Sequence, residues 1–227
     1  MSLMKFEDAL SLVLSLAAAK DHDILQITSL NVLLITVRCS EEHRRHIVES
    51  EGLEVICLLL HEETPGPQRR IAMQILLELA QEEMASEELV FRYAVPRPLS
   101  RYLMNKPGLK EKNLSMIVKV LVALGRSESL RDEISRELNT TIGEISRQVE
   151  EITPRQMNQV MRAIRCLSSM DWISKTLRTC PNTRLLVENA NTQRQTDPEC
   201  DEADEEIHCR RQNADFAENL LYWLENP

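Results

Sequence analysis

An apolar segment of eight residues recurs four times along the chain at a nearly constant spacing. The copies are LNVLLITV at Leu30–Val37, MQILLELA at Met73–Ala80, VKVLVALG at Val118–Gly125 and MRAIRCLS at Met161–Ser168. Successive copies are shifted by 43, 45 and 43 residues, and each has apolar residues at helical spacing. A period of this length is typical of stacked helical repeats, in which each repeat buries its apolar side against its neighbours.

A shorter helix is predicted ahead of the apolar segment in each repeat. Gly52–Leu60 reads GLEVICLLL and is followed by a turn at Thr64–Pro67. The same shift of 43 residues places Gly52–Leu60 over Val95–Leu103. One unit is therefore predicted as a helix, a break, a longer helix and a short lead into the next unit.

The stretch Gly52–Val95 resembles one armadillo repeat. The residues that carry the resemblance are a junction glycine and apolar residues of the two helices and of the lead that follows: Gly52, Ile56, Leu59, Leu60, Ala72, Ile75, Leu76, Leu79, Ala80, Val90, Ala94 and Val95. Extended over about residues 6–187, the resemblance implies an all-α, armadillo-like helical solenoid, a right-handed superhelix of about four degenerate repeats. HEAT repeats and a generic helical bundle remain alternatives.

Capping residues predict where helices begin. Ser40 can begin a short helix that runs through Val48. Thr153 is followed by Pro154, the order expected for an N-cap and a first helical position at which the missing N–H does no harm.

Charge and periodicity divide the chain into three predicted regions. Residues 1–187 form the repeat domain, 188–211 an acidic flexible linker and 212–227 a C-terminal amphipathic helix. Residues 188–208 hold eight carboxylates and one arginine, which is −7 of the total net charge of −9. In the last segment Phe216, Leu220, Leu221 and Leu224 fall on one side of a helix, which we expect either to cap the last repeat or to dock onto a partner.

Composition excludes several function classes. A net charge of −9 and 4% aromatic residues argue against a nucleic-acid partner. No apolar run approaches the ~20 residues of a membrane span, so no membrane partner is predicted. The N-terminus is a poor signal peptide and the six cysteines form no CxxC pair, so we expect a cytoplasmic or nuclear chain that is not secreted. We also expect a monomer.

No motif of catalysis or phosphate binding occurs in the sequence. Cys200 is separated from His208 and Cys209 by a spacing unlike that of structural zinc, so no metal and no cofactor are predicted. Cys39 continues an apolar helix and is expected to be buried. An enzyme with a site around Cys39, His43 and His46 is kept as an alternative of another class.

The family resemblance also implies where a peptide groove would lie. In armadillo proteins that grip extended peptides, the long helix presents a Trp and, four residues later, an Asn that pairs with the peptide backbone. The aligned Trp positions are Asn31, Gln74, Lys119 and Arg162. The aligned Asn positions are Ile35, Glu78, Ala123 and Cys166. No unit keeps the pair, so recognition of nuclear signals in the manner of importins is not expected.

The predicted function is a non-catalytic scaffold or adaptor that recognises a protein segment on the concave face of the solenoid. The expected wall is polar in its first half and basic in its second half. Its candidate partner-binding residues are Asn31, Gln74, Glu78, Lys119 and Arg162. The other non-catalytic hypothesis is a regulatory cofactor, such as a chaperone cofactor, that binds a folded client.

Overall fold

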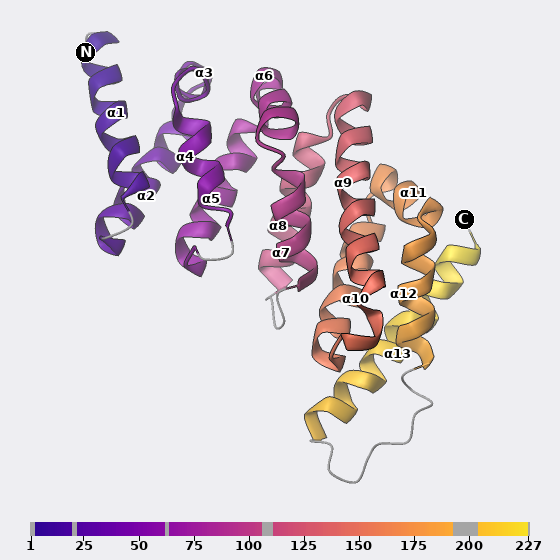
Figure 1. Ribbon diagram of the computed structural model, residues 1–227. Helices are drawn as coiled ribbons and strands as arrows, with labels where there is room; N and C mark the ends of the chain where they lie inside the picture. Colours follow the sequence, from indigo (N-terminus) through magenta and orange to yellow (C-terminus); the bar gives the residue numbers. More distant parts are fainter. Residues whose placement is uncertain (1–2, 20–21, 62–63, 106–110, 193–203, 227) are drawn as a thin grey trace. The chain divides into compact units, whose positions relative to one another are not determined.

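The computed structural model describes residues 3–19, 22–61, 64–105, 111–192 and 204–226, and no strand occurs within these ranges. Its α-helices are α1 (Leu3–Ala18), α2 (Asp23–Cys39), α3 (Glu41–Glu49), α4 (Gly52–Leu58), α5 (Gly66–Leu79), α6 (Glu83–Glu87), α7 (Pro96–Asn105), α8 (Glu111–Leu124), α9 (Glu128–Arg147), α10 (Pro154–Ser168), α11 (Asp171–Thr179), α12 (Pro181–Thr192) and α13 (Asp204–Glu225) (Figure 1). A π-helical turn, η1 (Glu88–Arg92), and a 3₁₀ turn, η2 (Val149–Glu151), complete the order. The prediction of an all-α chain is confirmed for the described residues.

The helices pack into two compact units. Unit 1 comprises Met1–Pro98 and Lys119–Leu130, and unit 2 comprises Leu99–Val118 and Arg131–Pro227. Each unit has its own buried core of aliphatic side chains. Burial of such side chains supplies the main driving force for folding.

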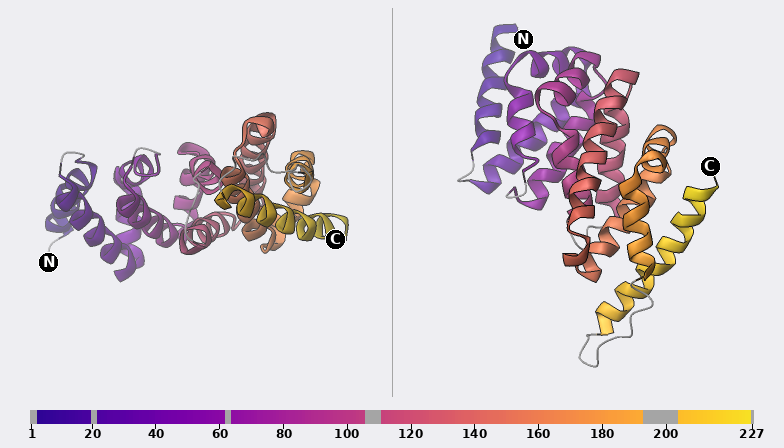
Figure 2. Two further views of the ribbon diagram at one scale, coloured as in Figure 1. Left: turned by 90° about the horizontal axis from the view of Figure 1, so that it is seen from below. Right: turned by 45° about the vertical axis from the view of Figure 1, so that its right-hand side comes forward.

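Unit 1 contains one complete helical repeat, made by α3, α4 and α5. α4 packs against both α3 and α5, and α5 packs along α2, the long helix of the preceding repeat (Figures 1 and 2). One side of α5 is buried, and its apolar members are Ile71, Ala72, Met73, Ile75, Leu76 and Leu79. The long helix predicted from the repeat at Met73–Ala80 is therefore confirmed.

The predicted helix starts are also confirmed. Ser40 is the N-cap of α3, and its Oγ accepts a hydrogen bond of 3.1 Å from the backbone N–H of His43. Thr153 is the N-cap of α10, where its hydroxyl and the side chain of Gln156 form a capping box ahead of Pro154.

The first two helices of a repeat are joined differently along the chain. Between α3 and α4 the chain turns at Ser50 and Glu51. The backbone of Gly52, the next residue, lies so close to Ile47 that a Cβ on Gly52 would meet the carbonyl oxygen of Ile47 at 2.8 Å. Between η1 and α7 the turn uses Ala94, whose φ of 48° lies in the left-handed region. No turn interrupts α9, which is one helix of 20 residues.

The last three helices repeat the order of α3, α4 and α5. The short helix α11 is followed by α12 and by the long helix α13, which packs on both α12 and α10 (Figure 2). α12 continues to Thr192 and α13 begins at Asp204. Residues 188–192 and 204–211 are thus helical, which corrects the bounds predicted for the linker, and residues 193–203 lie outside the described residues.

Candidate functional site

The outward sides of successive long helices form a surface in unit 1 that we call the long-helix face. On α2 it includes Ile24, Thr28, Asn31 and Ile35, which are four positions of one helical stripe and are all exposed. On α5 and on the part of α8 that belongs to unit 1, it includes Arg70, Gln74, Glu78, Lys119 and Ala123. None of these nine side chains is buried.

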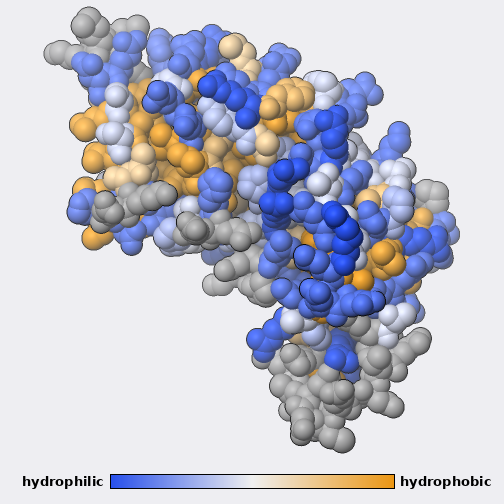
Figure 3. Space-filling model, in the orientation of Figure 1, coloured by the Kyte–Doolittle hydropathy of each residue, from blue (hydrophilic) through white to orange (hydrophobic). Residues whose placement is uncertain are grey.

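α2 exposes more aliphatic surface than its neighbours on this face. Ile24 is 81% exposed and Ile35 63%, and on the adjoining side of the helix Leu25 is 47% and Val32 43% exposed. Apolar side chains are gathered over α1 and α2 on the side shown in Figure 3. Because α2 is apolar on nearly all sides, its burial against α1, α3 and α5 leaves these aliphatic side chains uncovered.

A chain of polar contacts ties the C-terminal ends of the long helices in unit 1. Arg38 Nε donates to Glu78 Oε1 at 3.0 Å, and Gln81 Nε2 donates to Glu78 Oε2 at 3.0 Å. Arg126, just after α8, donates from Nη1 to the backbone oxygen of Gln81 at 2.5 Å. These contacts fix the register between α2, α5 and the end of α8.

The other end of α2 and α5 is joined by a contact of the buried Gln68. Gln68 Nε2 donates to Asp23 Oδ1 at 3.3 Å. Next to Gln68, the buried Arg69 donates to the backbone oxygens of His61 and Thr64 at 2.7 and 2.9 Å, which holds the turn before α5 in place.

Four of the five predicted partner-binding residues lie in unit 1. Asn31 and Lys119 are exposed, whereas Gln74 and Glu78 are half-buried. Asn31 Nδ2 donates to the backbone oxygen of Ile27 at 2.9 Å, so one of its amide hydrogens is already used. Glu78 is held by Arg38, as described above. The alignment that selected these positions thus places them on the outward side of their helices.

Arg162, the fifth residue, lies in unit 2 on the outward side of α10. It is half-buried, and Arg155 and Arg165 on the same helix are exposed. Arg165 stacks over the ring of Phe216 on α13, with its guanidinium carbon 5.4 Å from the ring centroid. α10 therefore carries three arginines that are exposed or half-buried.

Of the exposed aliphatic residues of α2, the alignment had placed Ile35 at the groove, whereas Ile24 and Val32 were missed by the sequence reasoning. The first half of the wall was expected to be polar, but Ile24, Val32 and Ile35 make it largely aliphatic at α2. The signal that could have found them is the run LNVLLITV itself, because a helix that is apolar all round cannot bury every side in a thin layer.

The cysteines differ from one another in exposure. Cys39 is exposed at the end of α2, which corrects the expectation of burial, because it continues the outward stripe of that helix. Burial, aided by Glu54, raises the pKa of the Cys57 thiol to about 12, so that this thiol stays protonated and inert at neutral pH.

The structure also bears on metal binding and on membrane insertion. Within the described ranges, no group of three or more His, Cys, Asp or Glu side chains is arranged to hold a metal ion. His208 lies 2.8 Å from the side chain of Gln212, and Cys200 is outside the described residues. Among the helices that the structure describes, none combines the length and the apolar character required to cross a membrane.

Comparison with known proteins places the fold. No protein-family model and no curated protein matches the sequence. A designed armadillo repeat protein matches the structure with a TM-score of 0.53 at 9% identity, over 92% of this chain and 99% of its own. A second designed armadillo repeat protein, in complex with the peptide (KR)4, matches with a TM-score of 0.52 at 13% identity, over 93% of this chain and 89% of its own. The chain therefore has the armadillo-like helical solenoid fold that the resemblance of Gly52–Val95 implied.

Proposed function

We propose that this chain is a non-catalytic interaction module, a scaffold or adaptor that holds a segment of a partner protein on the long-helix face of unit 1. The observation that carries the proposal is the row of uncovered aliphatic side chains on α2. Exposed apolar clusters rimmed by polar groups are characteristic of protein-interaction sites. The fold supports the proposal, because helical solenoids present extended binding surfaces.

The chemistry of the face selects the kind of segment. Ile24 and Ile35 offer apolar contact area, and the side-chain amides of Asn31 and Gln74 can pair with the N–H and C=O groups of a peptide backbone. Lys119 adds a cation, and Glu78 is already neutralised by Arg38. The bound segment is therefore aliphatic and acidic, the opposite in charge of the (KR)4 peptide held by the designed neighbour. Arg162, in unit 2, is proposed as a separate contact for an acidic side chain.

The test compares two double variants that make the same kind of change at different places. Ile24→Glu with Ile35→Glu places two charges on the long-helix face. Met84→Glu with Phe91→Glu places two charges on α6 and η1, where the side chains are similarly exposed at 67% and 58%. Partners are captured from cell extract with the unmodified chain and identified by mass spectrometry. Overlapping synthetic peptides that cover the sequence of each partner are then used for direct binding measurements.

We expect one aliphatic and acidic tile to bind the unmodified chain and the α6 variant equally. The α2 variant should lose at least about tenfold in affinity, the usual effect of disrupting a central apolar contact. Circular dichroism melting of all three proteins checks that the fold is intact, because exposed substitutions change stability little. Equal loss in both variants, or binding that only a folded fragment of the partner supports, would contradict the proposal.

A further inference from the structure

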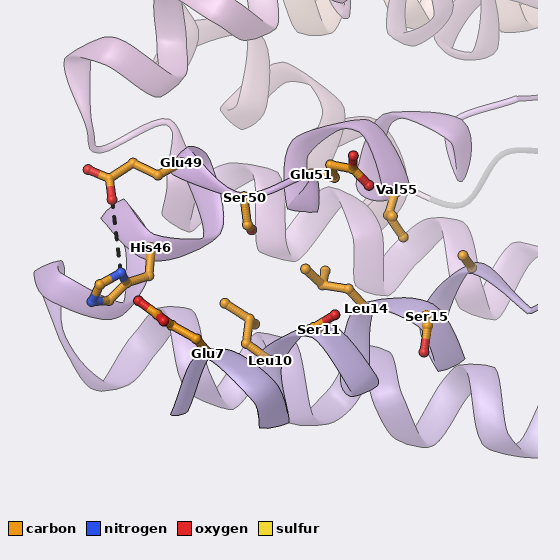
Figure 4. Close-up of a pocket in the computed structure, with 11 residues that line it drawn as sticks. Glu7, Leu10, Ser11, Leu14, Ser15, His46, Glu49, Ser50, Glu51 and Val55 are labelled. Carbon is orange, nitrogen blue, oxygen red and sulfur yellow. Dashed lines mark ion pairs between the residues drawn. The ribbon is translucent and has the colours of Figure 1, made fainter. Parts of the chain in front are cut away.

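Unit 1 has a hollow surface on another side, between α1 and the shorter helices α3 and α4. A groove of about 520 Å³ runs between α1 and the segment formed by α3, the turn after it and α4. Figure 4 shows Glu7, Leu10 and Leu14 of α1 facing His46 of α3 and Val55 of α4 across the opening. For comparison, pockets that hold small molecules span about 300–1,000 Å³. We call the groove in unit 1 the α1–α3 groove.

One wall of the α1–α3 groove is a regular helical stripe. Its members on α1 are Glu7, Leu10, Ser11, Leu14, Ser15 and Ala18. They fall at positions i, i+3, i+4, i+7, i+8 and i+11, so they occupy one side of α1 over about three turns, or roughly 16 Å. Leu10 and Leu14 are almost fully buried and form the apolar base, whereas the small residues Ser11 and Ser15 are exposed along the edge.

Carboxylates surround this apolar base. Glu7, Glu49 and Glu51 line the groove and are exposed, and His46 is the basic side chain that lines it. Glu49 lies 3.9 Å from His46 Nδ1, as the dashed line in Figure 4 indicates. Among the side chains that the structure describes, which begin at Glu7, no lysine or arginine forms an ion pair with Glu7 or Glu51. The groove therefore presents an apolar strip between acidic edges.

The hydrogen-bonding groups of the groove favour a helix over an extended strand as occupant. Ser15 Oγ donates to the backbone oxygen of Leu12 at 2.8 Å, and Ser50 Oγ donates to that of Ile47 at 2.9 Å. α1 and α3 are helices whose backbone groups are bonded internally, and in the turn between α3 and α4 the Gly52 N–H donates to Ser50 Oγ, so the walls offer no strand edge for pairing with an extended peptide. A helix satisfies its own backbone groups and can approach closely over Ser11 and Ser15.

We propose that the α1–α3 groove binds a basic amphipathic helix of a partner protein. Leucine-like side chains of that helix contact Leu10 and Leu14, and its lysines or arginines lie against Glu7, Glu49 and Glu51. The acidic segment of this chain carries the wrong charge to be the occupant. The site is separate from the long-helix face and selects the opposite charge, so one unit can hold two different segments.

The test uses two fluorescein-labelled helical peptides of about 15 residues, the length at which isolated helices begin to be populated. Both carry leucine at positions i, i+4 and i+7, and they differ only in having lysine or glutamate at the flanking positions. Fluorescence anisotropy should show binding of the lysine peptide alone. The triple variant Glu7→Gln, Glu49→Gln, Glu51→Gln should weaken it about tenfold, because each charge at an interface rim contributes modestly.

Matched variants distinguish binding in this groove from a general attraction of the lysine peptide to an acidic chain. Glu42→Gln, Glu87→Gln, Glu128→Gln removes the same charge from exposed positions of unit 1 outside the groove and should change the affinity less than about twofold. Ser11→Trp fills the groove and should abolish binding, whereas Ala9→Trp, exposed on another side of α1, should not. The variant Ile24→Glu with Ile35→Glu should bind the lysine peptide normally, whether or not the proposed function holds.

Any of four outcomes would overturn the inference. The first is equal binding of the lysine and glutamate peptides, and the second is an equal effect of the two triple variants. The third is binding by Ser11→Trp that matches binding by Ala9→Trp. A dimer of the unmodified chain in light scattering that Ser11→Trp dissociates would assign the groove to a second copy and would also overturn it. Circular dichroism melting confirms that each variant is folded before its binding is interpreted.

Discussion

The repeat of α3, α4 and α5 turns between its first two helices, whereas α9 runs as one continuous helix into the turn before α10. Both segments contain a glycine. At Gly52 a Cβ would meet Ile47 Cγ2 at 2.7 Å and the Ile47 backbone oxygen at 2.8 Å. At Gly143, inside α9, a Cβ would meet Asn182 Nδ2 at 3.2 Å, which is the end of a side chain that can move. The same residue type is therefore required by packing in one repeat and merely tolerated in the other.

This difference shows what keeps a degenerate repeat in register. The junction at Gly52 depends on close backbone approach, and Ser50 Oγ accepts from the Gly52 N–H at 3.3 Å to complete the turn. α9 has no such junction, so its place in the fold depends on the side chains along its length, such as Glu144, which forms a bidentate pair with the guanidinium of Arg101 on α7 at 2.9 to 3.2 Å. The long helices that follow, α5 and α10, are alike in their buried apolar sides.

The largest expected effect on stability comes from truncating a buried leucine in each of the two long helices, which tests whether α5 and α10 are alike. Leu79→Ala in α5 and Leu167→Ala in α10 each remove a fully buried leucine from a corresponding position. Each should lower the free energy of unfolding by about 2–5 kcal/mol, because the cavity left behind adds to the lost burial. Urea unfolding followed by circular dichroism measures both. If either variant is as stable as the unmodified protein, the long helix that carries it does not form the core of its repeat.

A smaller effect is expected at the junction of α3 and α4. Gly52→Ala should cost about 1–3 kcal/mol, because Ile47 is fully buried and cannot move away from the added methyl group. Gly66→Ala at the start of α5 is the control, since a Cβ there meets nothing within 4 Å. Thermal unfolding of the two variants gives the comparison. Equal melting temperatures would show that the turn at Gly52 is not tightly packed.

The smallest effect should have the opposite sign. Gly143→Ala removes backbone freedom from the interior of α9 and should raise the free energy of unfolding by about 0.5–1 kcal/mol. The same urea titration measures it. A loss of stability comparable to that of Gly52→Ala would mean that Gly143 also serves a close contact, and the contrast between the two repeats would fail.

Much of the fold follows from local sequence. Ser40 as N-cap and Thr153 ahead of Pro154 act within a few residues, and the repeat spacing is read directly from the sequence, so their consequences can be predicted without knowing the tertiary structure. The start of α13 could not be predicted in this way. Residues 204–212 lack apolar periodicity, and the helix is held through its later residues, of which Ala214 and Ala217 are fully buried in unit 2.

For the candidate site, the sequence predicted which residues lie on the outward sides of the helices, but not what those residues contact. The alignment placed Asn31, Gln74 and Lys119 on outward sides of their helices, because helical periodicity decides which residues share a side. The pairing of Glu78 with Arg38 depends on how two helices lie against each other across 40 residues of sequence. The exposure of Ile35 depends on how much of α2 its neighbours cover. Neither the pairing of Glu78 with Arg38 nor the exposure of Ile35 can be read from a local sequence pattern.

The polar contacts that join Arg38, Glu78, Gln81 and Arg126 also bear on how unit 1 responds to salt. The contact of 3.0 Å between Arg38 and Glu78 lies at the surface, since the Arg38 side chain is 52% exposed, whereas the contact of 3.3 Å between Gln68 and Asp23 is made by a buried amide. Dissolved ions screen exposed charges far more than buried groups. Added salt should therefore loosen α2 from α5 at the Arg38 end before it does so at the Asp23 end.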